Sequence, residues 1–132
     1  MNSRLQLIFF TGLLALLSLI LLPGCAVVAV GAAGATAVAY AKGDLEADLN
    51  APLTQTIAAT DSALYYLRLM KVDEKRTVDG VTMTIRDPDD KKVVIRLSPT
   101  SPSVTHISIR VDTFGNEARS NQILSEIEYS LY

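Results

Sequence analysis

The chain has 132 residues, the length of one modest domain rather than two. Its formal net charge is −2 and charges of both signs are interspersed, so it lacks the clustered basic surface that nucleic-acid binding requires, and we expect no nucleic-acid partner. Its single cysteine excludes a disulfide within the chain and a zinc site built from cysteines alone.

Residues 1–24 have the layout of a signal peptide. Arg4 is the only charged residue among them, and an apolar stretch runs from Leu5 to Leu22. Exported proteins carry such a stretch ahead of a cleavage site. At about 18 residues it also reaches the lower limit of a membrane-spanning helix, which is the alternative interpretation. The proline and glycine that follow would interrupt a helix and favour the processing site.

Cys25 stands where this leader ends. The preceding residues, Leu22, Pro23 and Gly24, resemble the lipobox of bacterial lipoproteins, although proline replaces the usual small residue. The resemblance implies that Cys25 is the lipid attachment site, that residues 1–24 are cut off, and that acyl chains such as palmitate are added. Several acyl chains anchor a protein stably to a membrane.

Ala26 follows the cysteine, in place of the aspartate that is associated with inner-membrane retention in enteric bacteria. By this analogy we expect the protein at the outer membrane of a bacterial cell envelope, facing the periplasm.

Residues 25–42 combine the lipidated cysteine with a tether rich in alanine and glycine, without a charge before Lys42. Ala29, Ala33 and Ala37 recur at every fourth position, a spacing that lets helices pack closely in lipid. Two interpretations stay open, a bland spacer and a membrane helix through which the chain oligomerises.

Residues 43–132 have the mixed composition of a soluble domain. Strict alternation over residues 44–49 predicts a strand with one buried face. A helix is expected from about Pro52 to Leu69, because apolar residues recur on one of its faces. These residues are Leu53, Ile57, Leu64 and Leu67.

Four further strands are predicted, because apolar and polar residues alternate between turn signals. The strands are 71–78, 81–86, 93–97 and 104–111. The turn signals are Asp79-Gly80, residues 87–90 and the loop 98–103. A final helix is expected to begin near Asn116 and to bury Ile123, Leu124, Ile127 and Leu131. The predicted class is therefore α+β, a curled antiparallel sheet of order β-α-β-β-β-β-α with two helices packed on one face.

Three segments resemble a family of small bacterial lipoproteins of unknown function. They are residues 43–57, residues 91–99 and, as the most specific, VTHISIRVDTFGNEARSNQIL at residues 104–124. The resemblance implies an envelope location and a small α+β domain behind the lipobox and tether. It transfers no catalytic residue.

Candidate residues for chemistry are few. The only histidine, His106, is expected on the polar face of its strand as a plain surface residue. Asp87, Asp89 and Asp90 lack the glycine and glutamate positions of an EF-hand calcium loop and indicate a solvated turn. We therefore expect no enzyme, no metal site and no cofactor.

Arg86, Arg96 and Arg110 come from three successive strands and alternate out of phase with the buried residues. We expect them on one exposed sheet face, either as solubilising residues or as a site for an anionic ligand such as a glycan, lipid headgroup or peptide. The leading hypothesis is a non-enzymatic, lipid-anchored protein that presents an interaction domain to a protein partner in the envelope. The anionic-ligand module and the membrane oligomer are the alternatives.

Overall fold

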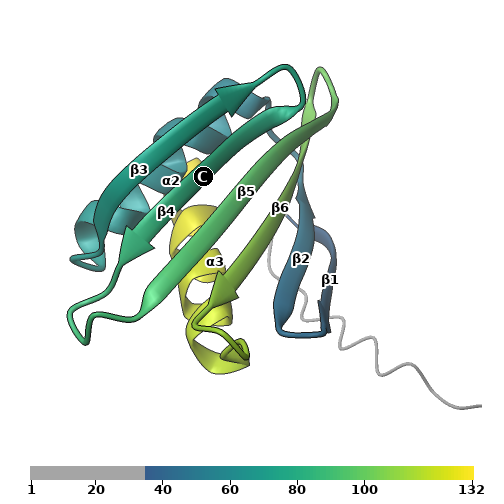
Figure 1. Cartoon of the computed structure of the whole chain (residues 1–132). Coiled ribbons are helices and arrows are strands. Elements are labelled where there is room, and N and C mark those ends of the chain that lie inside the picture. The colour runs from purple at the N-terminus through teal and green to yellow at the C-terminus, as the bar shows by residue number, and fades with distance from the viewer. Residues whose placement is uncertain (1–34) are drawn as a thin grey trace, which may run out of the picture.

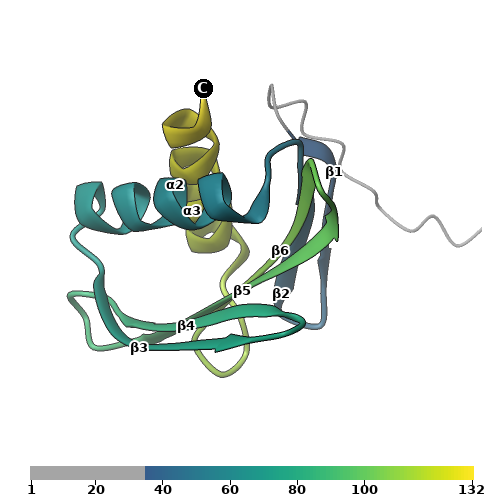
Figure 2. The ribbon, with the colours of Figure 1, turned by 90° about the horizontal axis from the view of Figure 1, so that it is seen from above.

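The computed structural model describes residues 35–132, which form an open six-stranded antiparallel sheet with two helices on one face (Figures 1 and 2). The predicted α+β class is confirmed. The predicted signal segment (residues 1–24), Cys25 and the tether up to residue 34 lie outside the described residues.

The described elements follow one another along the chain with short connections. They are β1 (Ala35–Ala41), β2 (Asp44–Leu49), α2 (Leu53–Tyr66), β3 (Met70–Thr77), β4 (Gly80–Arg86), β5 (Lys92–Ser101), β6 (Val104–Val111) and α3 (Glu117–Leu131). The strand order across the sheet is β1-β2-β6-β5-β4-β3. Within this sheet β1 and β3 are therefore the edge strands, and β2 joins the later strands through β6.

Strand β1 is the main departure from the sequence prediction, which placed residues 35–41 in the tether and counted five strands. It pairs with β2 across a tight turn at Lys42 and Gly43. Both turn residues have positive φ angles, 53° and 89°, which is the geometry of the hairpin turn whose twist matches the flanking strands. Alanine has a low strand propensity, and β1 forms because Val38 and Tyr40 pack against the core.

Two turn boundaries also differ from prediction. The residues between β3 and β4 are Val78 and Asp79, one position earlier than the expected turn. Strand β5 continues to Ser101 through part of the expected loop and includes Pro99. Proline is tolerated there because residues 98–101 pair with β6 but not with β4, so no hydrogen-bond donor is needed on the open side.

Helix α3 agrees with its prediction. The Asn116 side chain accepts a hydrogen bond from the Arg119 backbone N–H at 3.0 Å and caps the first turn. Of the four residues predicted to be buried, Ile123, Leu124 and Ile127 are buried, whereas Leu131 in the last turn is only partly buried.

Helix α2 buries a different set of residues from the one predicted. Leu64 is buried, but Leu53, Ile57 and Leu67 are only partly buried. The remaining buried positions are small residues and threonines, namely Thr56, Ala59, Thr60 and Ala63. Thr60 donates its hydroxyl hydrogen to the Thr56 carbonyl oxygen at 2.7 Å, which satisfies this buried polar group.

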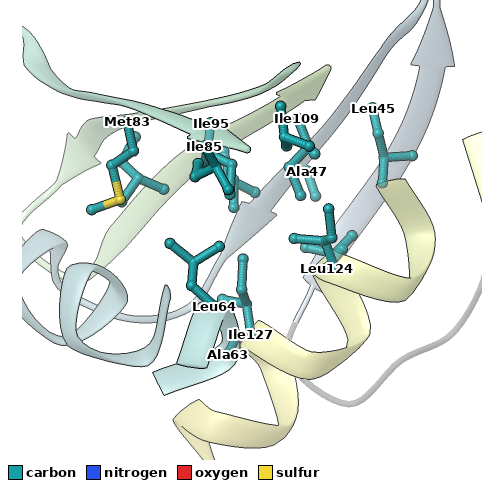
Figure 3. Close-up of a cluster of buried hydrophobic side chains, with 14 of the residues drawn as sticks. Leu45, Ala47, Ala63, Leu64, Met83, Ile85, Ile95, Ile109, Leu124 and Ile127 are labelled. Carbon is teal, nitrogen blue, oxygen red and sulfur yellow. The ribbon is translucent and has the colours of Figure 1, made fainter. Parts of the chain in front are cut away.

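The core lies between the two helices and the inner face of the sheet (Figure 3). The predicted alternation is confirmed in the four central strands. Their core residues are Leu45, Ala47, Leu49, Val81, Met83, Ile85, Val93, Ile95, Leu97, Ile107, Ile109 and Val111. Two polar side chains of α3, Ser120 and Glu128, are also buried, and Ser120 Oγ and Glu128 Oε1 have no hydrogen-bond partner within residues 35–132. Burial raises the pKa of the Glu128 carboxyl above its usual range.

Candidate functional site

The lipid attachment predicted at Cys25 lies outside the described residues, so it stays a prediction. Within residues 35–132, neither helix combines the length and hydropathy that a membrane span requires.

The three arginines singled out in the sequence, Arg86, Arg96 and Arg110, lie on the sheet face turned away from the helices. Arg96 is exposed and has no hydrogen bond or ion pair within the described part of the chain. Arg86 donates from Nη1 to the Asp90 carbonyl oxygen at 2.9 Å. The three side chains share a face, but among the described residues Arg96 has no partner, and Arg86 and Arg110 have different ones.

Strand β2 brings carboxylates to the same face, beside β6. The register pairs are Asp44 with Arg110, Glu46 with Ser108, and Asp48 with His106. Asp48 Oδ1 lies 2.7 Å from His106 Nδ1, so the histidine interpreted as plain surface has a cross-strand partner. The face carries both signs of charge, and binding of an anionic ligand there stays a prediction.

Arg110 joins two segments that are far apart in sequence. Its Nε donates to Asp44 Oδ1 at 2.8 Å and its Nη2 to Asp44 Oδ2 at 2.5 Å, a two-pronged contact. The same guanidinium donates to the carbonyl oxygens of Lys42 at 3.0 Å and Thr113 at 3.3 Å. The hydrogen bonds to the Asp44 carboxylate raise the pKa of the Arg110 guanidinium, which carries its positive charge throughout the physiological range. Arg110 therefore ties the β1–β2 turn to the loop that follows β6.

Two glycines bring these segments into backbone contact. A Cβ atom on Gly115 would lie 2.4 Å from Gly43 Cα and 2.5 Å from the Tyr40 hydroxyl, and one on Gly43 would lie 2.6 Å from the Phe114 carbonyl oxygen. Gly115 also has a positive φ of 84°, and Asp112 in the same loop has 64°. We call the β1–β2 turn and the loop 112–116 together the glycine corner. No side chain larger than hydrogen fits at its two contact positions.

The Phe114 side chain projects into solvent from the glycine corner. This side chain is 91% exposed although the backbone on both sides of it is fixed by Arg110 and by the glycine contact. Positive φ angles at non-glycine residues, such as Lys42 and Asp112, cost about 1–3 kcal/mol each and tend to gather at functional sites. The corner thus presents an exposed aromatic ring on a closely packed backbone.

The sequence interpretation missed this corner. It assigned Arg110 to an exposed basic face, whereas the guanidinium donates its hydrogen bonds to Asp44, Lys42 and Thr113 of the same chain. A signal for the corner was present in Lys42-Gly43, since a glycine directly before an alternating strand is typical of a hairpin turn. The contact with Gly115 had no local signal, because the two glycines are 72 positions apart. Among residues 35–132, no cluster of three or more histidine, cysteine or acidic side chains is placed to hold a metal ion.

The fold and the corner define a small α+β domain that presents an exposed aromatic side chain. The family model for a protein of unknown function (DUF3568) matches residues 7–130. The chain therefore belongs to this family, whose function is unknown. The match spans all three segments that carried the family resemblance in the sequence. No curated protein matches the chain.

Proposed function

We propose that this chain is a non-enzymatic, lipid-anchored protein of the bacterial cell envelope that presents a small interaction domain in the periplasm. The anchoring part rests on the signal-like residues 1–24 and the lipobox resemblance at Cys25.

The interaction part rests on one observation, the exposed Phe114 on the glycine corner. The backbone that carries Phe114 already packs against the β1–β2 turn, so little backbone freedom is lost on binding, and more of the contact energy becomes affinity. Aromatic anchors of this kind dominate the energetics of protein interfaces. The corner is therefore the surface on which we expect a protein partner to dock.

Site-specific photocrosslinking in cells tests this surface. A benzophenone amino acid at position 114 should trap one major partner. The same amino acid at position 78 is the matched control, because Val78 is 99% exposed but lies near the opposite end of the sheet. Identical products from both positions, or none from position 114, would refute the proposed surface.

The anchor has its own test. Cys25→Ser should leave an uncleaved precursor that takes up no radiolabelled palmitate. The substitution removes the only thiol of the chain, so no other cysteine can accept the lipid. Normal processing and labelling of the variant would show that the anchoring proposal is wrong.

A further inference from the structure

Tyrosines gather where α2 and α3 lie against each other. Tyr65 and Tyr66 of α2 and Tyr129 of α3 line a shallow groove of about 540 Å³, a volume within the range of ligand sites. Their side chains are 88%, 73% and 81% exposed. The other lining residues are Asp61, Ser62, Glu126 and Ser130. We call this feature the tyrosine groove.

The tyrosine groove has a negative electrostatic character. Asp61 and Glu126 contribute carboxylates, and none of the seven lining residues is basic. The last turn of α2 and the last turn of α3 contain no basic residue, and Arg68 directly after the C-cap of α2 is not among the residues that line the groove. The Asp61 carboxylate is partly compensated by Lys71 at 2.7 Å.

Glu126 is the uncompensated charge of the groove. It makes no hydrogen bond or ion pair with any residue of the described part of the chain. It lies one turn before Tyr129 on α3, the spacing at which two helical side chains are neighbours. An occupant that presents a cation at this point would find a carboxylate and an aromatic ring side by side.

We infer that the tyrosine groove binds an extended basic segment of a partner protein, with an arginine or lysine side chain between the tyrosine rings and Glu126. The face of a phenol ring attracts cations, and a guanidinium both stacks on the ring and pairs with a carboxylate. This site is separate from the Phe114 surface, so each proposal stands or falls by its own variants.

Nuclear magnetic resonance with the full chain in a non-ionic detergent tests the inference. A capped tetra-arginine peptide is titrated into the ¹⁵N-labelled protein at physiological salt. Amide shifts should concentrate in residues 61–66 and 126–130. A capped tetra-citrulline peptide, which keeps the shape of arginine without its charge, should bind at least about tenfold more weakly because the ion pair and the cation–π contact are lost.

Point variants locate the contact. Tyr129→Leu and Glu126→Gln should each weaken tetra-arginine binding about fivefold, whereas Tyr129→Phe should retain it because the ring remains. Glu117→Gln, at the other end of α3, and Phe114→Ala are matched controls that should leave binding unchanged. Thermal unfolding of all five variants checks that the exposed substitutions leave the fold intact.

Three results would overturn the inference. They are equal binding of the citrulline peptide, unchanged affinity in both Tyr129→Leu and Glu126→Gln, and amide shifts centred on the acidic residues of β2 instead of the tyrosine groove.

Discussion

The two edge strands of the sheet are built from opposite kinds of residue. Strand β3 contains five charged residues among its eight, whereas β1 has the sequence ATAVAYA and no charge. An edge strand exposes unpaired backbone groups, and charged side chains discourage another strand from adding there. Strand β3 therefore protects its own edge, and β1 is held by packing and by the glycine corner.

The charged side chains of β3 form ion pairs, one of them with α2. Lys71 Nζ lies 2.7 Å from Asp61 Oδ1 on the helix and 2.5 Å from Glu74 Oε2, and Arg76 Nε lies 2.7 Å from Glu74 Oε1. Hydrogen bonds from Lys71 and Arg76 lower the pKa of Glu74. Exposed ion pairs of this kind contribute little to stability. The β1 edge is held by buried side chains and close backbone contacts, whereas the charged side chains of β3 are exposed and screened. Substitutions should therefore be costly at β1 and mild at β3.

The largest effect should come from removing β1. A chain that begins at residue 43 should lose about 4 kcal/mol of unfolding free energy relative to one that begins at residue 35, because the buried Val38 side chain alone contributes about 1.5–3 kcal/mol and the pairing with β2 adds to it. Urea denaturation of both chains measures the difference. Equal midpoints would mean that β1 is an accessory strand.

Gly115→Ala should cost about 3 kcal/mol, from the strain of a positive φ and from the contact with Gly43. Val78→Ala, at the turn beside β3, is the control and should change stability by less than about 0.5 kcal/mol because its side chain is exposed. The measurement is thermal unfolding. An unchanged melting temperature in Gly115→Ala would show that the backbone of the corner can shift to accept a methyl group at little cost.

Two glutamates should make the free energy of unfolding depend on pH in opposite directions. Burial raises the folded-state pKa of Glu128 on α3, so the wild type loses stability as pH rises from 4.5 through that raised pKa. Glu128→Gln should therefore stabilise the protein by about 1 kcal/mol at pH 7 and have no effect well below pH 4.5. Glu74 on β3 has a lowered pKa, so its stabilisation is present above pH 4.5 and is lost as pH falls through the lowered value.

Glu74→Gln should accordingly destabilise at pH 7, by less than about 0.5 kcal/mol. Chemical denaturation between pH 3 and pH 8 measures both variants. If the stability differences of the two variants from the wild type changed with pH in the same direction, the buried environment assigned to Glu128 or the ion-paired one assigned to Glu74 would be wrong.

The smallest effect is expected for Lys71→Ala, a loss of less than about 0.5 kcal/mol that disappears in 1 M salt, because the ion pairs of β3 are exposed and screened. Denaturation at low and high salt measures it, and a larger loss that persists in high salt would show that β3 is held by more than charge.

Local pattern was enough to predict the class and most central elements of this protein. Alternation in residues 81–86 and 104–111 identified which side chains face the core, because in a strand successive side chains point to opposite faces. The start of α3 was predictable from Asn116, because an N-capping residue acts on the backbone only a few positions away. These features depend on neighbours in sequence, so the sequence determined them by itself.

The tertiary structure decided the rest. Strand β1 is rich in small residues and has no strong pattern of its own, and it becomes a strand because β2 offers an edge and the core offers a place for Val38. Arg110 resembled any surface arginine until its partner was known to be Asp44, 66 positions away. Contacts over such distances depend on the register of whole strands and on the crossing of helices, which no local repeat encodes. The glycine corner and the tyrosine groove exist only once those elements have packed.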